Sequence, residues 1–352
     1  MANLLRHRGF GLALLTAGVL AAGGFAYAAK SAAYHVIARY ALGGRDVGYD
    51  YLRLDAPSHR LFVAHGTRVE VLDPETGKKL GEIADTPGVH GIAFAPEFGH
   101  GFTSNGLARS VTMFDLATLK TLAVIKYTGV KPDSIVYDPE TRRVFAVNGG
   151  DTGDVSVIAA DSGAIVATIP LGGGKLEELQ FDGRGHGFVN DEDKNVVHVF
   201  DTHKLAQLAT WPIAPGEGPT GLAFDKQRHR LFAACGNNKL VVLDSDSGKV
   251  VGTAAIGADP DGAVFDPKTQ RILVSNRDGT LSVVDGNAAS GYPTLQTVRT
   301  EPFARTIALD ERNGRVYLPA AKFGPAPAPT ADNPKPRPVM VPESFVVLVV
   351  GE

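Results

Sequence analysis

The stretch Phe265–Asp285, FDPKTQRILVSNRDGTLSVVD, reads as strand, turn, strand, turn, strand. Apolar and polar residues alternate over its short runs, which is typical of half-buried pleated strands. Asp, Ser, Asn and Gly stand between the runs, where they supply the side-chain hydrogen bonds and positive φ angles of tight turns. The stretch therefore predicts a meander of short antiparallel strands.

Close copies of this stretch recur along the chain. Each copy is marked by an apolar anchor residue, usually followed by Asp and a turn. The anchors are Leu54, Phe94, Tyr137, Phe181, Phe224, Phe265 and Leu309, with spacings of 40, 43, 44, 43, 41 and 44 residues. A period near 40 is typical of propeller blades. The repeat predicts an all-β fold, a seven-bladed β-propeller of four-stranded antiparallel blades.

The two ends of the repeat suggest how the ring closes. The last blade stops one strand short at SFVVLVVGE (344–352), and a surplus strand, YHVIARYALGG (34–44), precedes the first anchor. Circular closure hides sheet edges that would otherwise pair with other chains. We expect Tyr34–Gly44 to join the last blade, so that residues 29–352 form a single propeller domain.

The first 28 residues have the layout of a secretory signal peptide. A basic start, MANLLRHRG, precedes the apolar run FGLALLTAGVL and the small-residue pattern AYA at Ala26–Ala28. Cleavage after Ala28 would place the protein in the periplasm or outside the cell, and an uncleaved anchor is the alternative. The single cysteine, Cys235, excludes an internal disulfide.

Composition narrows the classes of function. The chain has 35 basic and 38 acidic residues, a formal charge of -3, and no basic tract after the leader, so nothing indicates nucleic-acid binding. The motifs CxxCH, HExxH and GxSxG are absent from the sequence. We expect a monomer whose partner is an unknown protein or small molecule. No cofactor is certain, and a divalent cation is the candidate.

Three segments carry a family resemblance: YDPETRRVFAVN (137–148), FDPKTQRILVSN (265–276) and VVLDSDSGKVVGTAAIGADPDGAVF (241–265). They resemble the YVTN-type repeat of YncE-like bacterial seven-bladed propellers, and the resemblance covers nearly all of the chain after the leader. It implies an exported protein. The roles of that family range from partner or ligand binding to none assigned, and several otherwise related propellers are enzymes.

Two sets of positions are expected to line a funnel at the top of the central channel. The first ring lies four residues before the anchors and comprises Asp50, His90, Asp133, Glu177, Thr220, Asp261 and Arg305. The second ring ends the second strands and comprises His65, Asn105, Asn148, Asp191, Cys235, Asn276 and Ala320. Apart from Thr220, Cys235 and Ala320, these residues are the predicted ligand-binding set.

The first ring carries four carboxylates against one Arg and one His. Two like charges about 8 Å apart repel by roughly 2 kcal/mol at an effective dielectric near 20. Such a cluster needs a compensating cation, raised pKa values, or Arg305 close by. Carboxylate and amide oxygens suit calcium, and histidine suits zinc. The candidate metal ligands are Asp133, Glu177, Asp261 and His90.

A purely structural interpretation competes with this site. Channel mouths of propellers are commonly polar and wet, and Asn105, Asn148 and Asn276 stand where an amide bonds the adjacent backbone. Four histidines fall in the turns on the opposite face and are predicted to be surface turn residues: His59, His100, His186 and His229. Cys235 is predicted to be a small buried thiol, because no base lies near it in sequence.

A Pro-rich insertion, KFGPAPAPTADNPKPRPVMVPESF (Lys322–Phe345), interrupts the last blade between its second and third strands. Its prolines, within 325–342, favour an extended path across the top face. It is predicted to be a lid, a recognition strip for a partner, or a loose loop. As a lid it would bring Lys335 and Arg337 near the acidic ring.

Three functional hypotheses follow. The preferred one is an exported binding or scaffold module that acts through the top funnel without catalysis. The alternative is a metal-dependent hydrolase or lyase resembling lactonase-type propellers, with Glu177, Asp133 and Asp261 as ligands and His90 or His65 as acid/base. The third is a structural accessory to a periplasmic redox or transport system.

Overall fold

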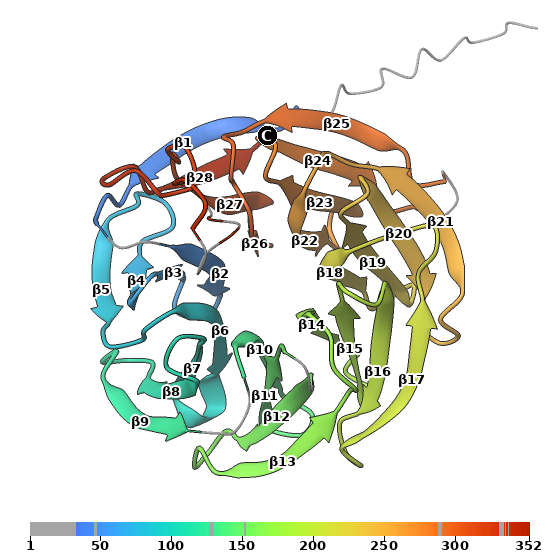
Figure 1. The fold of residues 1–352 in the computed structure, drawn as a ribbon, viewed down its shortest axis with the longest axis horizontal. Helices are drawn as coiled ribbons and strands as arrows, with labels where there is room; N and C mark the ends of the chain where they lie inside the picture. The colour runs from blue at the N-terminus through green and yellow to red at the C-terminus, as the bar shows by residue number, and fades with distance from the viewer. Residues whose placement is uncertain are drawn as a thin grey trace, which may run out of the picture. The chain divides into compact units, whose positions relative to one another are not determined.

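The computed structural model describes residues 33–45, 48–126, 130–150, 153–287, 291–330, 334, 336 and 338–352. These residues form seven four-stranded antiparallel sheets arranged as blades around a central channel (Figure 1). The prediction of a seven-bladed propeller is confirmed. The predicted leader and its cleavage site lie outside the described residues. Within them, no helix is long and apolar enough to cross a bilayer.

The first three blades follow one another in sequence order. The first is β2 (Tyr49–Asp55), β3 (Arg60–His65), β4 (Arg68–Leu72) and β5 (Lys79–Ile83). The second is β6 (Val89–Ala95), the short helix η1 (Pro96–Phe98), β7 (His100–Asn105), β8 (Ser110–Asp115) and β9 (Thr121–Lys126). The third is β10 (Pro132–Asp138), β11 (Arg143–Asn148), β12 (Asp154–Ala159) and β13 (Ile165–Pro170).

The remaining blades repeat the same order from the centre outward. The fourth is β14 (Leu176–Phe181), β15 (His186–Asp191), β16 (Val196–Asp201) and β17 (Ala206–Pro212). The fifth is β18 (Pro219–Asp225), β19 (Arg230–Cys235), β20 (Lys239–Asp244) and β21 (Val250–Ala255). The sixth is β22 (Pro260–Asp266), β23 (Arg271–Asn276), β24 (Thr280–Asp285) and β25 (Thr294–Arg299).

The last blade closes the ring with both ends of the propeller domain. It contains β26 (Ala308–Asp310), β27 (Arg315–Ala320), β28 (Val346–Gly351) and, as its outermost strand, β1 (His35–Ala41). β1 pairs antiparallel with β28, from His35 opposite Gly351 to Ala41 opposite Val346. The predicted closure is confirmed, and Figure 1 shows the first and last strands side by side.

The apolar core lies between the blades. Each anchor phenylalanine packs on a phenylalanine from the second strand of the preceding blade. The ring centroids are 4.8 Å apart for Phe62 and Phe94, and 5.0 Å apart for Phe145 and Phe181. Full burial of such a side chain stabilises by about 1.5–3 kcal/mol. The anchors recur in the sequence because each blade needs this contact with its neighbour.

A bulge near the start of the innermost strands positions the site. In β2 the pairing with β3 shifts between Tyr49 and Leu52, and the same shift recurs in β6, β10, β14, β18 and β22. A bulge leaves residues unpaired and bends the strand. The residues within it are therefore free to turn away from their own blade, toward the channel or the next blade.

Candidate functional site: a charged funnel

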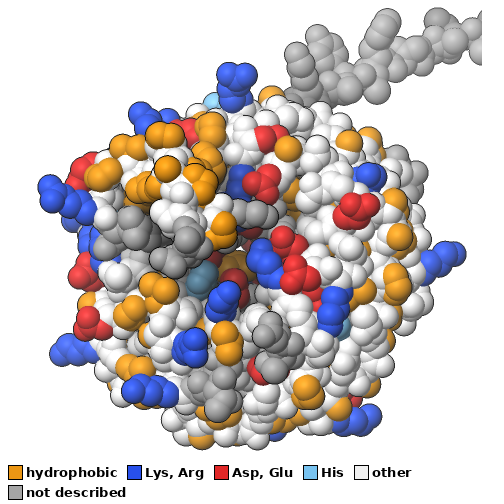
Figure 2. All heavy atoms as spheres, in the orientation of Figure 1, with side chains coloured by type: hydrophobic (Ala, Val, Ile, Leu, Met, Phe, Trp, Pro, Cys, Tyr) orange, Lys and Arg blue, Asp and Glu red, His pale blue; other side chains and the backbone are white. Residues whose placement is uncertain are grey.

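The first-ring residues surround the upper end of the channel, as predicted. Six of them lie in the first two positions of the innermost strands, and Arg305 lies just before β26. Charged side chains gather round the central hollow of this face (Figure 2). The structure brings five of these residues into one network of ion pairs: Asp50, His90, Asp133, Asp261 and Arg305.

Arg305 is the centre of this network. Its Nε donates to Asp261 Oδ2 at 2.7 Å, and its terminal nitrogen lies 3.3 Å from Asp50 Oδ1. Arg277, from the loop after β23, donates to the other Asp261 oxygen at 2.9 Å. Two of the four ring carboxylates are therefore neutralised by guanidinium groups. Of the kinds of compensation that the sequence left open, Arg305 close to the carboxylates is present here.

His90 links Asp50 to a further carboxylate, Asp133. Its Nδ1 donates to Asp50 and lies 4.0 Å from Asp133 Oδ1. Burial alone would lower the pKa of His90, but the hydrogen bond and charge of Asp50, with the charge of Asp133, raise it to about 9. The imidazole is therefore cationic at neutral pH, and its proton stands between the ring and Asp50.

Asp133 and Glu177 are the two ring carboxylates without a guanidinium partner among the described residues. Burial, with the charge of Asp50, raises the pKa of Asp133 to about 6 despite nearby His90. Burial and the charge of Asp133 raise the pKa of Glu177 well above its usual range, although Lys175 lies 2.8 Å away. The side chain of Asp133 is 26% exposed toward the funnel. It is the ring acid best placed to meet a ligand.

Hydrogen bonds between blades hold the ring residues in place. Thr306 donates to the carbonyl of Asp50 at 2.6 Å, and Thr220 to the carbonyl of Pro260 at 2.8 Å. Ser104 and Ser275, next to the second-ring asparagines, donate to the carbonyls of Asp133 and Arg305. The funnel residues thus sit on a backbone fixed by the neighbouring blades, which makes the ring a rigid surface.

The second ring is not part of the funnel, so that part of the prediction is wrong. All five predicted residues are buried, and each bonds a side chain of the third strand in its own blade. The pairs are His65–Glu70 at 2.8 Å, Asn105–Thr112 at 2.9 Å, Asn148–Ser156 at 2.9 Å, Asp191–His198 at 3.1 Å and Asn276–Ser282 at 3.1 Å. The structural interpretation expected these amides to bond the adjacent backbone. Asn276 does so, donating to the carbonyls of Val274 and Thr280 at 3.2 Å, whereas Asn105 and Asn148 bond side chains.

These pairs carry a sequence signal that was readable in advance. The third strands are otherwise apolar on their buried face, yet Glu70, Thr112, Ser156, His198 and Ser282 interrupt them. In the fifth blade the corresponding positions of the second and third strands hold Cys235 and Val241, which are apolar or nearly so. A polar residue in one strand matched by a polar residue in the next indicates a buried hydrogen-bonded pair.

Cys235 and the turn histidines test the remaining predictions. Cys235 is fully buried, and burial raises the pKa of its thiol to about 12, as expected for a structural cysteine. His229 lies in a turn, 2.7 Å from Asp246, as predicted. His186 and His100 are instead the first residues of β15 and β7, and His186 lies 2.8 Å from Asp182. These contacts are local and lie far along the strands from the funnel.

His59 is better connected than predicted. It approaches Asp310 of the last blade at 3.3 Å and Glu75 at 3.9 Å, and the three groups are close enough to share an ion. However, Arg312 lies 3.1 Å from Asp310, and Arg315 pairs with Glu75. Guanidinium groups already neutralise both acids, so this group fits an ion-pair network that joins the first and last blades.

The donor set at the funnel fits a metal better. Asp50, His90 and Asp133 each offer a ligand atom, and these atoms lie within 4.8 Å of one another. One His with two carboxylates suits zinc or a related ion. An ion would have to displace the His90 proton and tolerate Arg305 at 3.3 Å from Asp50. Asp261, a predicted ligand, is occupied by two guanidinium groups instead.

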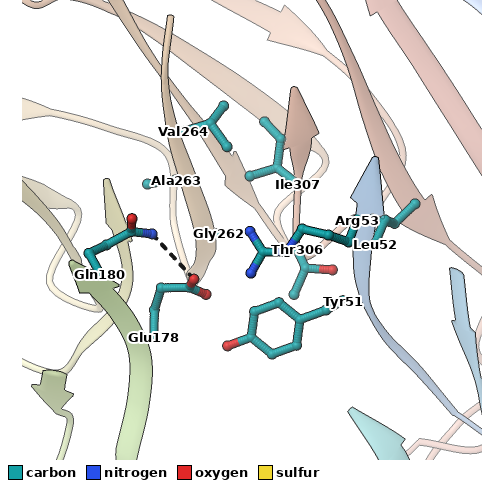
Figure 3. Close-up of a pocket in the computed structure, with 10 residues that line it drawn as sticks. All are labelled: Tyr51, Leu52, Arg53, Glu178, Gln180, Gly262, Ala263, Val264, Thr306 and Ile307. Atoms are coloured by element: carbon teal, nitrogen blue, oxygen red, sulfur yellow. Dashed lines mark hydrogen bonds between the residues drawn. The ribbon is translucent and has the colours of Figure 1, made fainter. Parts of the chain in front are cut away.

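Sequence reasoning missed the layer beneath the ring. Tyr51, Arg53, Glu178 and Gln180 converge on a cavity of about 40 Å³ within the channel (Figure 3). Burial raises the pKa of Glu178 to about 7, against the opposing influence of Arg53 and Tyr51. The signal for this layer was the set of positions one and three residues before the anchors, which also turn inward.

The Pro-rich insertion joins β27 to β28, as predicted. Its base is a short antiparallel pairing, in which Val341 N–H donates to Lys322 O and Gly324 N–H to Val339 O, both at 2.8 Å. Phe323 packs on Phe303 with ring centroids 4.5 Å apart. The residues Lys335 and Arg337, expected near the acidic ring, lie outside the described residues.

Comparisons with known proteins bear on the fold alone. No family model and no curated protein matches the chain. A chain of hydrazine synthase from Kuenenia stuttgartiensis is similar in structure, with a TM-score of 0.67 and 16% sequence identity over 78% of this chain and 93% of that chain. Such a likeness supports the propeller architecture and transfers no activity.

Proposed function

We propose that this chain is an exported propeller that binds a cationic group of a ligand or partner through its top funnel and carries out no chemistry itself. The leader pattern and the resemblance to YncE-like propellers support export. One observation supports binding above the others. Asp133 faces the funnel, and among the described residues its nearest cation is His90 at 4.0 Å, beyond hydrogen-bond distance.

The protonation of the ring argues for binding over catalysis. His90 keeps its proton at neutral pH, since its pKa is raised to about 9 by Asp50 and Asp133 against the effect of burial. A group that holds its proton near pH 7 is a poor general base. Arg305 is committed to Asp50 and Asp261. The funnel is thus a fixed pattern of charges with one under-compensated acceptor, which suits an amine or guanidinium group.

Binding of small cationic probes to the mature chain tests this proposal. We expect N-acetyl-argininamide or spermidine to shift the His90 imidazole signals in NMR spectra. Asp133→Asn should weaken probe binding by roughly tenfold, as for loss of a charge-assisted hydrogen bond. Asp259→Asn is the matched control, because that side chain is 67% exposed near the same rim. Equal binding by both variants would contradict the proposal.

A metal-dependent hydrolase or lyase is the second candidate, favoured by the convergence of Asp50, His90 and Asp133 within 4.8 Å. A cation held there would polarise a carbonyl or activate water. Metal analysis before and after chelation separates the two candidates. One tightly held ion per chain, lost in the variant Asp50→Asn with Asp133→Asn, supports the enzyme. A metal-free chain whose stability is unaffected by chelation would exclude the metal-dependent enzyme.

The insertion is proposed as a recognition strip beside the funnel. Its prolines from Pro325 to Pro329 are exposed, and so are Val339 and Val341. Apolar side chains cluster on this face of the molecule in Figure 2. Replacing residues 326–337 by a short Gly-Ser linker should weaken binding of a protein partner while leaving the melting temperature nearly unchanged. Retention of full binding would show that the strip is not used.

A further inference from the structure

A second cavity lies further along the channel, away from the funnel. Its volume is about 190 Å³, and it is lined by the later residues of β2, β6 and β10. The same strands carry Asp50, His90 and Asp133 near their beginnings, so the two sites lie at opposite ends of the same three strands. The walls used in the argument below are Arg53, Leu54, Phe94, Ile135, Val136 and Tyr137.

Arg53 is the only charged residue at its level of the channel. The residues that precede the seven anchors are Arg53, Ala93, Val136, Gln180, Ala223, Val264 and Ala308. Arg53 lines both this cavity and the smaller one beneath the ring. A single guanidinium group therefore stands between the two spaces, and apart from Gln180 the other residues at its level are small or apolar.

The guanidinium of Arg53 has no carboxylate within ion-pair distance among the described residues, and Glu178 faces it across the upper cavity. The Nε of Arg53 donates to the carbonyl of Ile92 at a long 3.4 Å. Burial raises the pKa of Glu178 and the charge of Arg53 lowers it, but the two side chains form no direct ion pair. A half-buried guanidinium without a direct carboxylate partner, beside a second cavity, favours an anion from outside.

The rest of the cavity is apolar and incompletely covered. Leu54, Phe94 and Val136 are half-buried, although each belongs to an innermost strand whose neighbours are mostly buried. The hydroxyl of Tyr137 bonds Glu97, which fixes the aromatic ring at the edge of the cavity. Contact with the apolar part of a ligand would remove these surfaces from water, which is favourable. Recognition pockets commonly combine such walls with one polar group that orients the ligand.

We propose that this end of the channel binds a small carboxylate with an apolar body, whose carboxylate pairs with Arg53. The cavity is somewhat larger than the roughly 150 Å³ space that holds benzene in another protein, so a single ring or a short branched chain fits it. A guanidinium group recognises a carboxylate through two parallel hydrogen bonds. This site is distinct from the funnel and does not depend on the function proposed there.

Benzoate is the test probe, added to the mature chain at millimolar concentration and followed by NMR. We expect shifts at Phe94, Ile135 and Val136 and none at the His90 imidazole. Arg53→Gln should weaken binding by roughly tenfold or more, because a charge-assisted pair is lost. Arg142→Gln is the matched control, since Arg142 stacks on Phe98 outside the cavity.

Two further measurements keep the proposal open to refutation if Arg53→Gln folds poorly. Val136→Phe fills the cavity without touching the charge, and it should abolish the shifts. Benzyl alcohol, a neutral analogue, should bind more weakly than benzoate and equally to wild type and Arg53→Gln. Absence of benzoate binding, binding that does not depend on Arg53, or shifts confined to the funnel would each overturn the proposal.

Discussion

Arg305 and Asp261 form a direct ion pair at 2.7 Å although they come from different blades, 44 residues apart. The carboxylate is almost fully buried, and the guanidinium is 29% exposed. The pair joins the sixth and seventh blades at the centre of the ring. Because Arg305 also reaches Asp50, one side chain connects three consecutive blades around the point where the ring closes.

Removal of this guanidinium should destabilise the propeller. Arg305→Gln leaves Asp50 and Asp261 buried with less compensation, and breaking a buried pair by removing one partner is costly. We expect the free energy of unfolding in urea to fall by about 2–4 kcal/mol at pH 7. Arg39→Gln is the control, because Arg39 is 54% exposed and its pair with Glu301 is a surface one. Equal effects would show that the central network does not support the ring.

The imidazole of His90 should titrate far above an ordinary histidine. Its folded pKa is raised from 6.5 to about 9, so the stability it contributes is fully present below pH 6.5 and is lost as pH rises toward 9. NMR titration of the His90 ring protons measures this directly. The decline in unfolding free energy between those pH values should be smaller in His90→Gln. A midpoint near 6.5 would mean that the bond to Asp50 is absent in solution.

Asp133 should oppose folding once it ionises. Its folded pKa is raised from 3.8 to about 6, so the protein binds a proton more tightly when folded, and stability falls as pH rises between those values. Asp133→Asn should therefore raise the urea midpoint at pH 8 and leave it nearly unchanged at pH 4. The gain should be about 1–2 kcal/mol after allowance for partial exposure. A loss of stability at pH 8 would contradict the assignment.

The buried pair of the sixth blade, Asn276 and Ser282, should be replaceable by the residues that stand at the same positions in the fifth blade. Asn276→Ala removes the amide that donates to the Ser282 hydroxyl and should lower the unfolding free energy by about 1–3 kcal/mol. The double change Asn276→Cys with Ser282→Val copies Cys235 and Val241 and should recover part of that loss. Recovery stays partial because Gly257 N–H also donates to Ser282. A double variant no better than Asn276→Ala would show that the blades are not interchangeable here.

Alternate residues in the part of the insertion that leads into β28 should hold the insertion against the core. Met340 is 5% exposed and packs in the core between the last and first blades, so Met340→Ala should lower the unfolding free energy by about 2 kcal/mol or more. The neighbouring Val339 is 49% exposed, and Val339→Ala should change it by less than about 0.5 kcal/mol. If urea unfolding shows similar losses of unfolding free energy for the two variants, the insertion packs differently.

The sequence alone was enough for the architecture. The anchors, the strand patterns and the surplus strand 34–44 predicted the number of blades and their closure, because each blade is a local repeat that must bury its anchor against the next one. The first ring followed from the same register. The placement of its members could be read from the repeat because one position in a repeated unit faces one direction in every copy.

The pairing of charges was decided by the tertiary structure. His65 and Asp191 occupy a repeated position too, yet they turn into their own blades, where they bond Glu70 and His198. Arg277 and Arg53 were overlooked because neither stands at a first-ring position. Which acid meets which base depends on distances across the ring, between residues tens to hundreds of positions apart. A periodic sequence determines the direction of a side chain, whereas only the closed ring determines what that side chain meets.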